Sequence, residues 1–275
     1  MNVQTRITRQ FNKLKNEGRK GLVVFITSGD PNYDTSMEIL NGLSEAGADF
    51  IELGMPFSDP MADGPAIQES SHRALTNGMT LRKTLQMVEK FRLNNKTTPM
   101  ILMGYFNPIY TYGVDAFLHD AVKAGVDGLI MVDLPPEEET ELCLPAIEKG
   151  LNFIFLTTPT STNSRLSRIL VNASGFLYYV SITGVTGTRS AATIDIEQHL
   201  GRIRKKTDLP VAVGFGISNS EQVKAVASIA DAVVVGSAVV NVIKENLDKD
   251  KCPKEGLIDK VHTFVSSLSE SLNNV

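Results

Sequence analysis

Short apolar runs recur along the whole chain, and longer stretches with helical periodicity lie between them. Each run is apolar at successive rather than alternate positions, which is typical of a parallel strand buried on both faces. The eight predicted strands are residues 22–27, 50–54, 100–104, 128–132, 152–156, 176–181, 210–214 and 232–236. The helical patterns cover residues 35–46, 81–93, 114–124, 136–149, 164–173, 194–205, 220–228 and 238–247. This alternation predicts an α/β fold with a parallel sheet.

Eight strands, each followed by a helix, are what a (β/α)8 TIM barrel requires, and 275 residues suit one such barrel. An open, doubly wound sheet is the alternative, because counting strands does not prove closure. The spacing continues evenly without an interdomain linker, so we favour the barrel as a single domain over residues 1–275. An amphipathic N-terminal helix, with Phe11 and Leu14 on its core side, and a last helix over residues 257–272 would be additions to it.

Charge and composition exclude several other classes of protein. The formal net charge of −4 argues against a nucleic-acid partner. No uncharged apolar run reaches transmembrane length, and residues 1–20 lack the apolar segment and cleavage site of a secretory signal. The two cysteines lie far apart, and the four histidines show no ligand spacing, so we expect no metal site. We therefore expect a cytoplasmic protein that does not bind membranes.

The second predicted strand carries a charged residue, Glu52, in an otherwise apolar run. A buried carboxylate is costly unless it is paired or neutralised. Burial should also raise its pKa toward the range useful for general acid–base catalysis. Active sites of (β/α)8 barrels lie at the carboxyl ends of the strands, and Glu52 is close to such an end. We favour a catalytic role over a structural glutamate in a hydrogen-bond network.

The segment that follows, residues 54–65, is too long and too rich in proline and glycine for a minimal connection. Long loops at this end of a barrel usually hold substrate or act as lids. The segment carries Asp59 and Asp63, and each could instead be a turn former beside a proline or a glycine. Spacing alone does not decide between the two aspartates.

Three late strand ends are rich in glycine, at residues 184–187, 214–216 and 236–237. Backbone N–H groups after the last two strands of a barrel, together with a helix N-terminus, commonly bind phosphate. These glycines, with the Ser237 hydroxyl, indicate a phosphorylated substrate. In the sixth strand, either Tyr178 or Tyr179 must point into the barrel, where its hydroxyl could contact substrate or merely pack.

Several segments of the sequence match motifs of one known family. They are FITSGDP at 25–31, IELGMPFSDP at 51–60, DGP at 63–65, MGYFNP at 103–108, GVTG at 184–187 and GFGI at 214–217. In these segments the chain resembles the tryptophan synthase α subunit family, and the resemblance extends over residues 11–247. It implies a (β/α)8 lyase that cleaves indole-3-glycerol phosphate to indole and glyceraldehyde 3-phosphate.

The resemblance also implies which residues carry the reaction. Glu52 and Asp63 match the two catalytic carboxylates of the family, which decides the choice between Asp59 and Asp63. Glu52 would move protons between the glycerol hydroxyl and C3 of the indole. Ionised Asp63 would accept the indole N–H and stabilise positive charge on the ring.

Substrate contacts follow from the same resemblance. Phosphate contacts fall on Gly187, Gly216, Gly236 and Ser237, and the residues that line the indole pocket are Phe25, Met103, Tyr178 and Phe215. Residues 184–193 resemble the mobile lid of the family, with Thr186 placed to touch Asp63 when the lid closes. The roles of Arg189 and of the charged segment 244–255 stay open.

The family acts with a β subunit that carries pyridoxal phosphate and receives indole through a tunnel in an α2β2 complex. We therefore expect a β-subunit partner, with residues 56–60 and 107–108 facing it, and no cofactor bound to this chain. Two other functions are weaker hypotheses. A barrel isomerase would need its acid–base pair at other strand ends, and a regulatory subunit without turnover would not need both Glu52 and Asp63.

Overall fold

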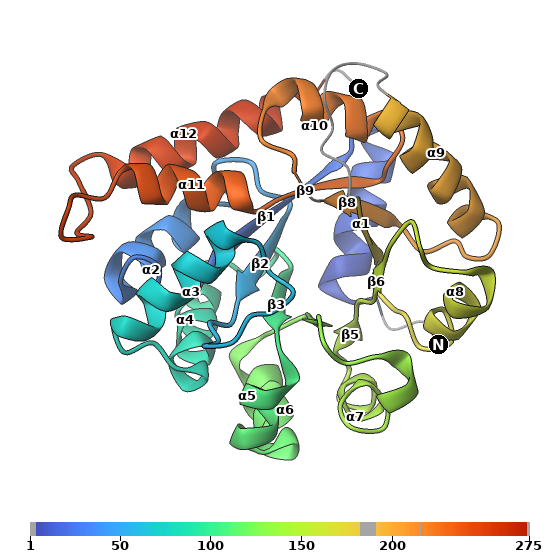
Figure 1. The fold of residues 1–275 in the computed structure, drawn as a ribbon, viewed down its shortest axis with the longest axis horizontal. Coiled ribbons are helices and arrows are strands. Elements are labelled where there is room, and N and C mark those ends of the chain that lie inside the picture. The colour runs from blue at the N-terminus through green and yellow to red at the C-terminus, as the bar shows by residue number, and fades with distance from the viewer. Residues whose placement is uncertain (1–3, 182–190, 215, 274–275) are drawn as a thin grey trace.

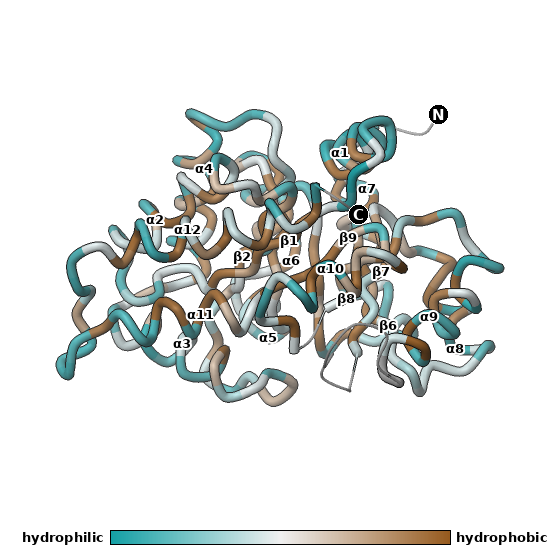
Figure 2. The backbone as a smooth tube through the Cα atoms, turned by 90° about the horizontal axis from the view of Figure 1, so that it is seen from above, coloured by the Kyte–Doolittle hydropathy of each residue, from teal (hydrophilic) through white to brown (hydrophobic). Residues whose placement is uncertain are grey.

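The computed structural model describes residues 4–181, 191–214 and 216–273 (Figure 1). Parallel strands occupy the centre and helices surround them, as the alternating sequence pattern predicts. The strands are β1 (Gly21–Thr27), β2 (Phe50–Gly54), β3 (Met100–Gly104), β4 (Gly128–Met131), β5 (Asn152–Phe153), β6 (Leu156–Thr157), β7 (Leu177–Val180), β8 (Val211–Gly214) and β9 (Ala232–Val235). Figure 2 shows hydrophobic segments concentrated in these central strands and hydrophilic ones in the peripheral loops.

The sheet closes on itself through residues 152–157. Its strand order is β5-β4-β3-β2-β1-β9-β8-β7-β6, and only Ile154 and Phe155 separate its two ends, β5 and β6. The Ile154 N–H donates to the Leu129 carbonyl on the β4 side at 2.9 Å, and the Tyr178 N–H of β7 donates to the Phe155 carbonyl at 3.0 Å. One barrel strand therefore changes partner midway, which confirms the eight-stranded barrel and excludes the open sheet.

The helices that follow the strands agree with the predicted pattern in most places. They are α2 (Tyr33–Gly42), α4 (Leu81–Asn94), α6 (Val114–Ala124), α7 (Cys143–Glu148), α8 (Asn163–Ile169), α9 (Ala191–Arg204), α10 (Ser220–Ala227) and α11 (Ser237–Glu245). The helix predicted over 136–149 is wrong in extent, because only a short 3-10 turn, η1 (Pro136–Glu138), precedes α7. Pro145 lies in the first turn of α7, where its missing N–H costs no hydrogen bond.

Two helices at the carboxyl ends of the strands were not predicted. They are α3 (Pro65–Thr76) and α5 (Phe106–Tyr112). The buried face of α3 includes Ser70, Ser71 and Arg73, so it shows no apolar periodicity. In α5, Ile109 is the one buried residue, so this helix also lacks a repeating pattern of apolar residues.

The N-terminal helix α1 (Arg6–Asn16) covers the amino-terminal end of the barrel. Its buried side chains Ile7, Phe11 and Leu14 belong to the same apolar cluster as the inward-facing residues of the strands. The Phe11 ring lies 4.5 Å from that of Phe50 and 5.7 Å from that of Phe176, measured between centroids. The barrel interior is thus blocked at this end, and a ligand must enter at the carboxyl ends of the strands.

The last helix, α12 (Leu257–Glu270), packs on α11 and α2, outside the barrel. Together with α1 it confirms the two predicted terminal additions. Within the described part of the chain, every helix is too short or too polar to span a lipid bilayer.

Candidate active site

Glu52 points into the barrel from the middle of β2. Side chains alternate across a strand, and Phe50, two residues earlier, belongs to the interior cluster. Phe25 of β1 and Ile101 of β3 flank Glu52 in the sheet register. The side chain is 1% exposed, and its Oε2 atom has no hydrogen-bond partner among the described residues. A buried carboxylate oxygen without a partner is rare in folded proteins and marks a candidate functional group.

The environment of Glu52 favours its protonated form. Burial raises the pKa of this carboxyl group to about 8, and the nearby charge of Asp63 adds to the increase. A pKa in this range allows the group both to give and to take a proton near neutral pH.

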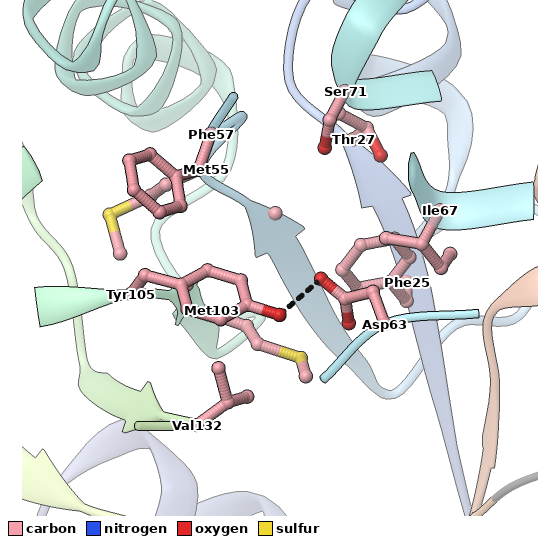
Figure 3. A pocket seen from close by; sticks show the side chains of 12 residues that line it. Phe25, Thr27, Met55, Phe57, Asp63, Ile67, Ser71, Met103, Tyr105 and Val132 are labelled. Carbon is pink, nitrogen blue, oxygen red and sulfur yellow. Dashed lines mark hydrogen bonds between the residues drawn. The ribbon is translucent and has the colours of Figure 1, made fainter. Parts of the chain in front are cut away.

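Asp63 lies on the segment between β2 and α3, and Tyr105 holds it in place. The Tyr105 hydroxyl donates to Asp63 Oδ2 at 3.0 Å and accepts the N–H of Ala62 at 3.0 Å (Figure 3). Burial raises the pKa of Asp63, whereas the hydrogen bond from Tyr105 lowers it by stabilising the carboxylate.

Asp59 has a different environment from Asp63. It is exposed, and its Oδ2 atom accepts a hydrogen bond from the neighbouring Ser58 hydroxyl at 2.5 Å. A short polar contact within an exposed loop is typical of a turn former. The geometry therefore supports Asp63 as the functional aspartate of this segment.

Asp63 borders a cavity at the carboxyl ends of the first strands (Figure 3). Its lining is mostly apolar, with Asp63 and a few hydroxyl groups as the polar exceptions. The lining residues are Phe25, Thr27, Gly54, Met55, Phe57, Asp63, Ile67, Ser71, Met103, Gly104, Tyr105 and Val132. The rings of Phe57 and Tyr105 lie 5.3 Å apart and form one wall. The chemistry of this lining, apolar side chains around one carboxylate, matches a flat apolar ring that carries one hydrogen-bond donor for Asp63.

Of the adjacent tyrosines in β7, Tyr178 is the one that faces the interior. It packs against the interior cluster, whereas Tyr179 packs outside the sheet, with its ring 6.0 Å from that of His199. Burial and the charges of Glu52 and Asp63 raise the pKa of Tyr178 well above its usual value. Its hydroxyl therefore stays protonated in the neighbourhood of both carboxyl groups. A Cβ atom at Gly214 would lie 2.5 Å from this hydroxyl, so the glycine leaves the space that Tyr178 occupies.

The predicted phosphate contacts that the structure describes follow the last two strands. Gly216 has a φ of +74°, a conformation that favours glycine. Gly236 is the N-cap of α11, and Ser237 is the first residue of that helix. The first backbone N–H groups of a helix have no partner within it and can bind an anion. Thr186, Gly187, Phe215, Arg189 and most of the predicted lid lie outside the described residues.

Several residues that line the cavity were not named from the sequence, among them Tyr105, Ile67 and Ser71. Tyr105 directly follows the third predicted strand, and a polar side chain at the carboxyl end of a barrel strand could have marked it as a candidate site residue. Ile67 and Ser71 lie one turn apart on α3, the helix that sequence periodicity did not reveal. Within the described ranges, histidine, cysteine, aspartate and glutamate form no group of three that could hold a metal ion.

Comparison with known proteins agrees with this geometry. A family model described as "Tryptophan synthase alpha chain" matches residues 11–270. The chain is similar to tryptophan synthase subunit alpha from Legionella pneumophila str. Paris, with 38% identity, a TM-score of 0.90 and coverage of 98% of this chain and 99% of that chain. It is also similar to a chain of Mycobacterium tuberculosis tryptophan synthase, with 34% identity, a TM-score of 0.86 and 98% coverage of both chains. The chain therefore belongs to the tryptophan synthase alpha chain family, the lyases that cleave indole-3-glycerol phosphate in tryptophan biosynthesis.

Proposed function

We propose that Glu52 and Asp63 are the catalytic residues for cleavage of indole-3-glycerol phosphate to indole and glyceraldehyde 3-phosphate. The observation that carries this proposal is a fully buried carboxyl group with an unpartnered oxygen and a raised pKa, close to a second carboxyl group at the mouth of the barrel. Two carboxyl groups held in different environments can take different roles in one reaction.

The reaction breaks the bond between C3 of the indole and the first carbon of the glycerol chain. A proton is added to C3, which makes the ring a leaving group, and the hydroxyl on the adjacent carbon loses its proton. When the bond breaks, its electron pair returns to the ring and the former alcohol carbon becomes an aldehyde. Protonated Glu52 supplies the first proton, and its carboxylate accepts the second, so the residue ends in its starting state.

Asp63 acts on the other side of the ring. Protonation at C3 places positive charge on the indole nitrogen, and an ionised carboxylate that accepts the N–H stabilises this charge. The hydrogen bond from Tyr105 supports the ionised form of Asp63. Two nearby negative charges repel each other, so the charge on Asp63 favours the neutral form of Glu52.

The remaining groups orient the substrate. Phe25, Met103 and Tyr178 face the interior beside Glu52, where the indole ring would lie. Gly216, Gly236 and Ser237 would bind the phosphate, and Gly187, Phe215 and Thr186 complete the proposed contacts. For Phe25, Met103, Tyr178, Gly216, Gly236 and Ser237 these assignments are supported by positions around one barrel end and by the family resemblance. For Gly187, Phe215 and Thr186, which lie outside the described residues, the family resemblance is the support.

The family implies a tryptophan synthase β subunit as partner. We propose that the complex is α2β2, that pyridoxal phosphate belongs to the β subunit only, and that this chain acts in the cytoplasm without a cofactor of its own. The exposed residues Met61 and Tyr110 lie near the segments expected to face the partner.

The proposed catalytic pair is tested by measuring glyceraldehyde 3-phosphate formation from indole-3-glycerol phosphate, with and without a β subunit. Glu52→Gln keeps the shape of the side chain and removes its proton transfer, so the rate should fall by at least about 100-fold while substrate still binds. Asp63→Asn should show a comparable loss, and Asp59→Asn, in the same loop, should retain wild-type activity. Wild-type turnover by Glu52→Gln would show that Glu52 is structural.

A further inference from the structure

Both ring nitrogens of His199 lie against backbone carbonyl oxygens. Nδ1 is 2.7 Å from the carbonyl of Asp195, one turn earlier in α9. Nε2 is 3.0 Å from the carbonyl of Pro159, in the segment that joins β6 to α8. The second contact crosses between two units of the barrel, because α9 follows β7 and residues 158–162 follow β6.

This arrangement depends on the protonation of the ring. A carbonyl oxygen only accepts hydrogen bonds, and a neutral imidazole has only one N–H to donate. A neutral His199 can therefore satisfy one of the two carbonyls and must turn a lone pair toward the other. The imidazolium form donates to both. His262 provides a contrast, because among the described residues its ring makes one carbonyl contact, from Nε2 to Ile39 at 2.9 Å, which a neutral ring can satisfy.

We propose that protonation of His199 fastens residues 158–162 to α9, so that this connection at the carboxyl end of the barrel loosens as the ring loses its proton. Histidine is the side chain that most readily gains and loses a proton near neutral pH. Neither the catalytic carboxylates nor the phosphate residues take part, and the inference is independent of the proposed function.

The groups around His199 limit how far the segment is released. Arg202, one turn later in α9, donates from Nη2 to the carbonyl of Ser161 at 2.6 Å. Its guanidinium stays charged at every relevant pH, so this second contact persists. Asp195 precedes the ring in α9, and Tyr179 of β7 packs beside it. Residues 158–162 themselves contain no ionisable side chain.

Within the segment, the backbone provides two local reporters. The Thr158 N–H donates to the Ser161 hydroxyl at 3.1 Å, and the Ser161 N–H donates to the Thr158 carbonyl at 3.0 Å. Both bonds belong to the turn whose carbonyls, at Pro159 and Ser161, are held by α9. Loosening the turn at Pro159 should therefore increase hydrogen exchange at these two amides.

The test combines ring and backbone measurements on the whole chain between pH 5 and 8.5. Two-bond ¹H–¹⁵N spectra report whether each nitrogen of His199 carries a proton. Protection factors of the Thr158 and Ser161 amides, corrected for intrinsic exchange, should fall by about tenfold in the same pH range in which the ring loses its proton.

Two matched variants separate this effect from a general response to pH. His199→Gln is neutral at every pH and should show low protection with no step. His262→Gln removes the other bonded histidine and should keep the wild-type step. An unchanged step in His199→Gln, or constant protection in the wild type while His199 titrates, would overturn the proposal. If His199→Gln fails to fold, the wild-type spectra and protection factors decide alone.

Discussion

Burial of Glu52 couples the stability of the barrel to the protonation of this proposed catalytic residue. Its pKa is about 8 in the folded protein, against an ordinary value of 4.5. Between these two values, the folded protein keeps a proton that the unfolded chain releases. The free energy of unfolding therefore decreases as the pH rises through this window. The proposed proton-transfer residue therefore also lowers the free energy of unfolding at neutral and higher pH.

Glu52→Gln removes this cost, because the amide cannot ionise. We expect the variant to be more stable than the wild type, with an advantage that grows by up to about 1.4 kcal/mol per pH unit across the window. Urea unfolding at pH 5, 6, 7 and 8 measures this difference. A difference that stays constant with pH would contradict the raised pKa.

Removing the hydroxyl of Tyr105 should slow catalysis and leave the fold unchanged. Tyr105→Phe keeps the ring packed on Phe57 but loses the hydrogen bond to Asp63. Since that bond lowers the pKa of Asp63, the acidic limb of the pH–rate profile should move to higher pH. We expect kcat/KM to fall by about tenfold, the worth of one such bond.

Tyr110→Phe is the matched control for this variant. Tyr110 is 66% exposed on the neighbouring α5. Removal of its hydroxyl should leave the pH–rate profile of the isolated chain unchanged, because this residue does not line the cavity. An unshifted acidic limb in Tyr105→Phe would show that this hydrogen bond does not act on catalysis.

At the scale of elements, a few buried aspartates join parts of the barrel that lie far apart in the sequence. Asp127 precedes β4 and accepts hydrogen bonds from Arg6 of α1 at 2.9 Å, from Arg92 of α4 at 2.6 Å and from the N–H of Met100 in β3 at 2.8 Å. One carboxylate thus connects α1, α4 and β3 at the amino-terminal end of the barrel. These contacts lie at the opposite end of the barrel from the cavity that Asp63 borders.

Asp127→Ala should be strongly destabilising. The side chain of Arg92 is only 7% exposed, and it would keep a buried charge without its carboxylate partner, with hydrogen bonds to backbone carbonyls alone. Breaking a buried ion pair in this way costs about 3–5 kcal/mol, which urea unfolding measures. Asp115→Ala, in the exposed first turn of α6, removes one carboxylate at a cost of at most about 1 kcal/mol. Equal losses for the two variants would show that the Asp127 contacts add nothing.

At the scale of the whole molecule, one end of the barrel is closed by packed side chains and the other carries a cavity. The end covered by α1 is packed with Phe11, Phe50 and Phe176, and the other end carries the cavity. We propose that residues 1–275 form one domain, because the strand over residues 152–157 bonds to both β4 and β7 and leaves no edge at which to divide the sheet.

The surface of the catalytic end should bind the β subunit. Tyr110 is exposed there on α5, and a charge in its place should weaken an apolar interface. Tyr110→Asp is expected to bind the β subunit about tenfold more weakly in a titration of activity, with the rate of the isolated chain unchanged. Leu93→Asp is the control, since Leu93 is 71% exposed but lies at the other end of the barrel. Wild-type affinity in Tyr110→Asp would place the interface elsewhere.

Local patterns predicted most of the fold. Consecutive apolar residues located every strand of the barrel, because a strand covered on both faces needs them. The pattern of apolar residues did not predict α3, because the buried face of this helix includes the polar residues Ser70, Ser71 and Arg73. Glu52 could be proposed because a charge in an apolar strand is visible in the chain itself, whereas Asp63 was separated from Asp59 only by the family resemblance.

The sequence by itself determined the strands of the barrel, most of its helices, the family and the two candidate carboxyl groups, because these depend on residue type, local spacing and the family's motifs. Only the tertiary structure decided that the sheet is closed, since closure depends on which strands residues 152–157 bond to. It also decided that Tyr178 faces inward, that Tyr105 holds Asp63 and that His199 meets two carbonyls. These contacts join residues far apart along the chain, or set the direction of a side chain, and no local pattern encodes either.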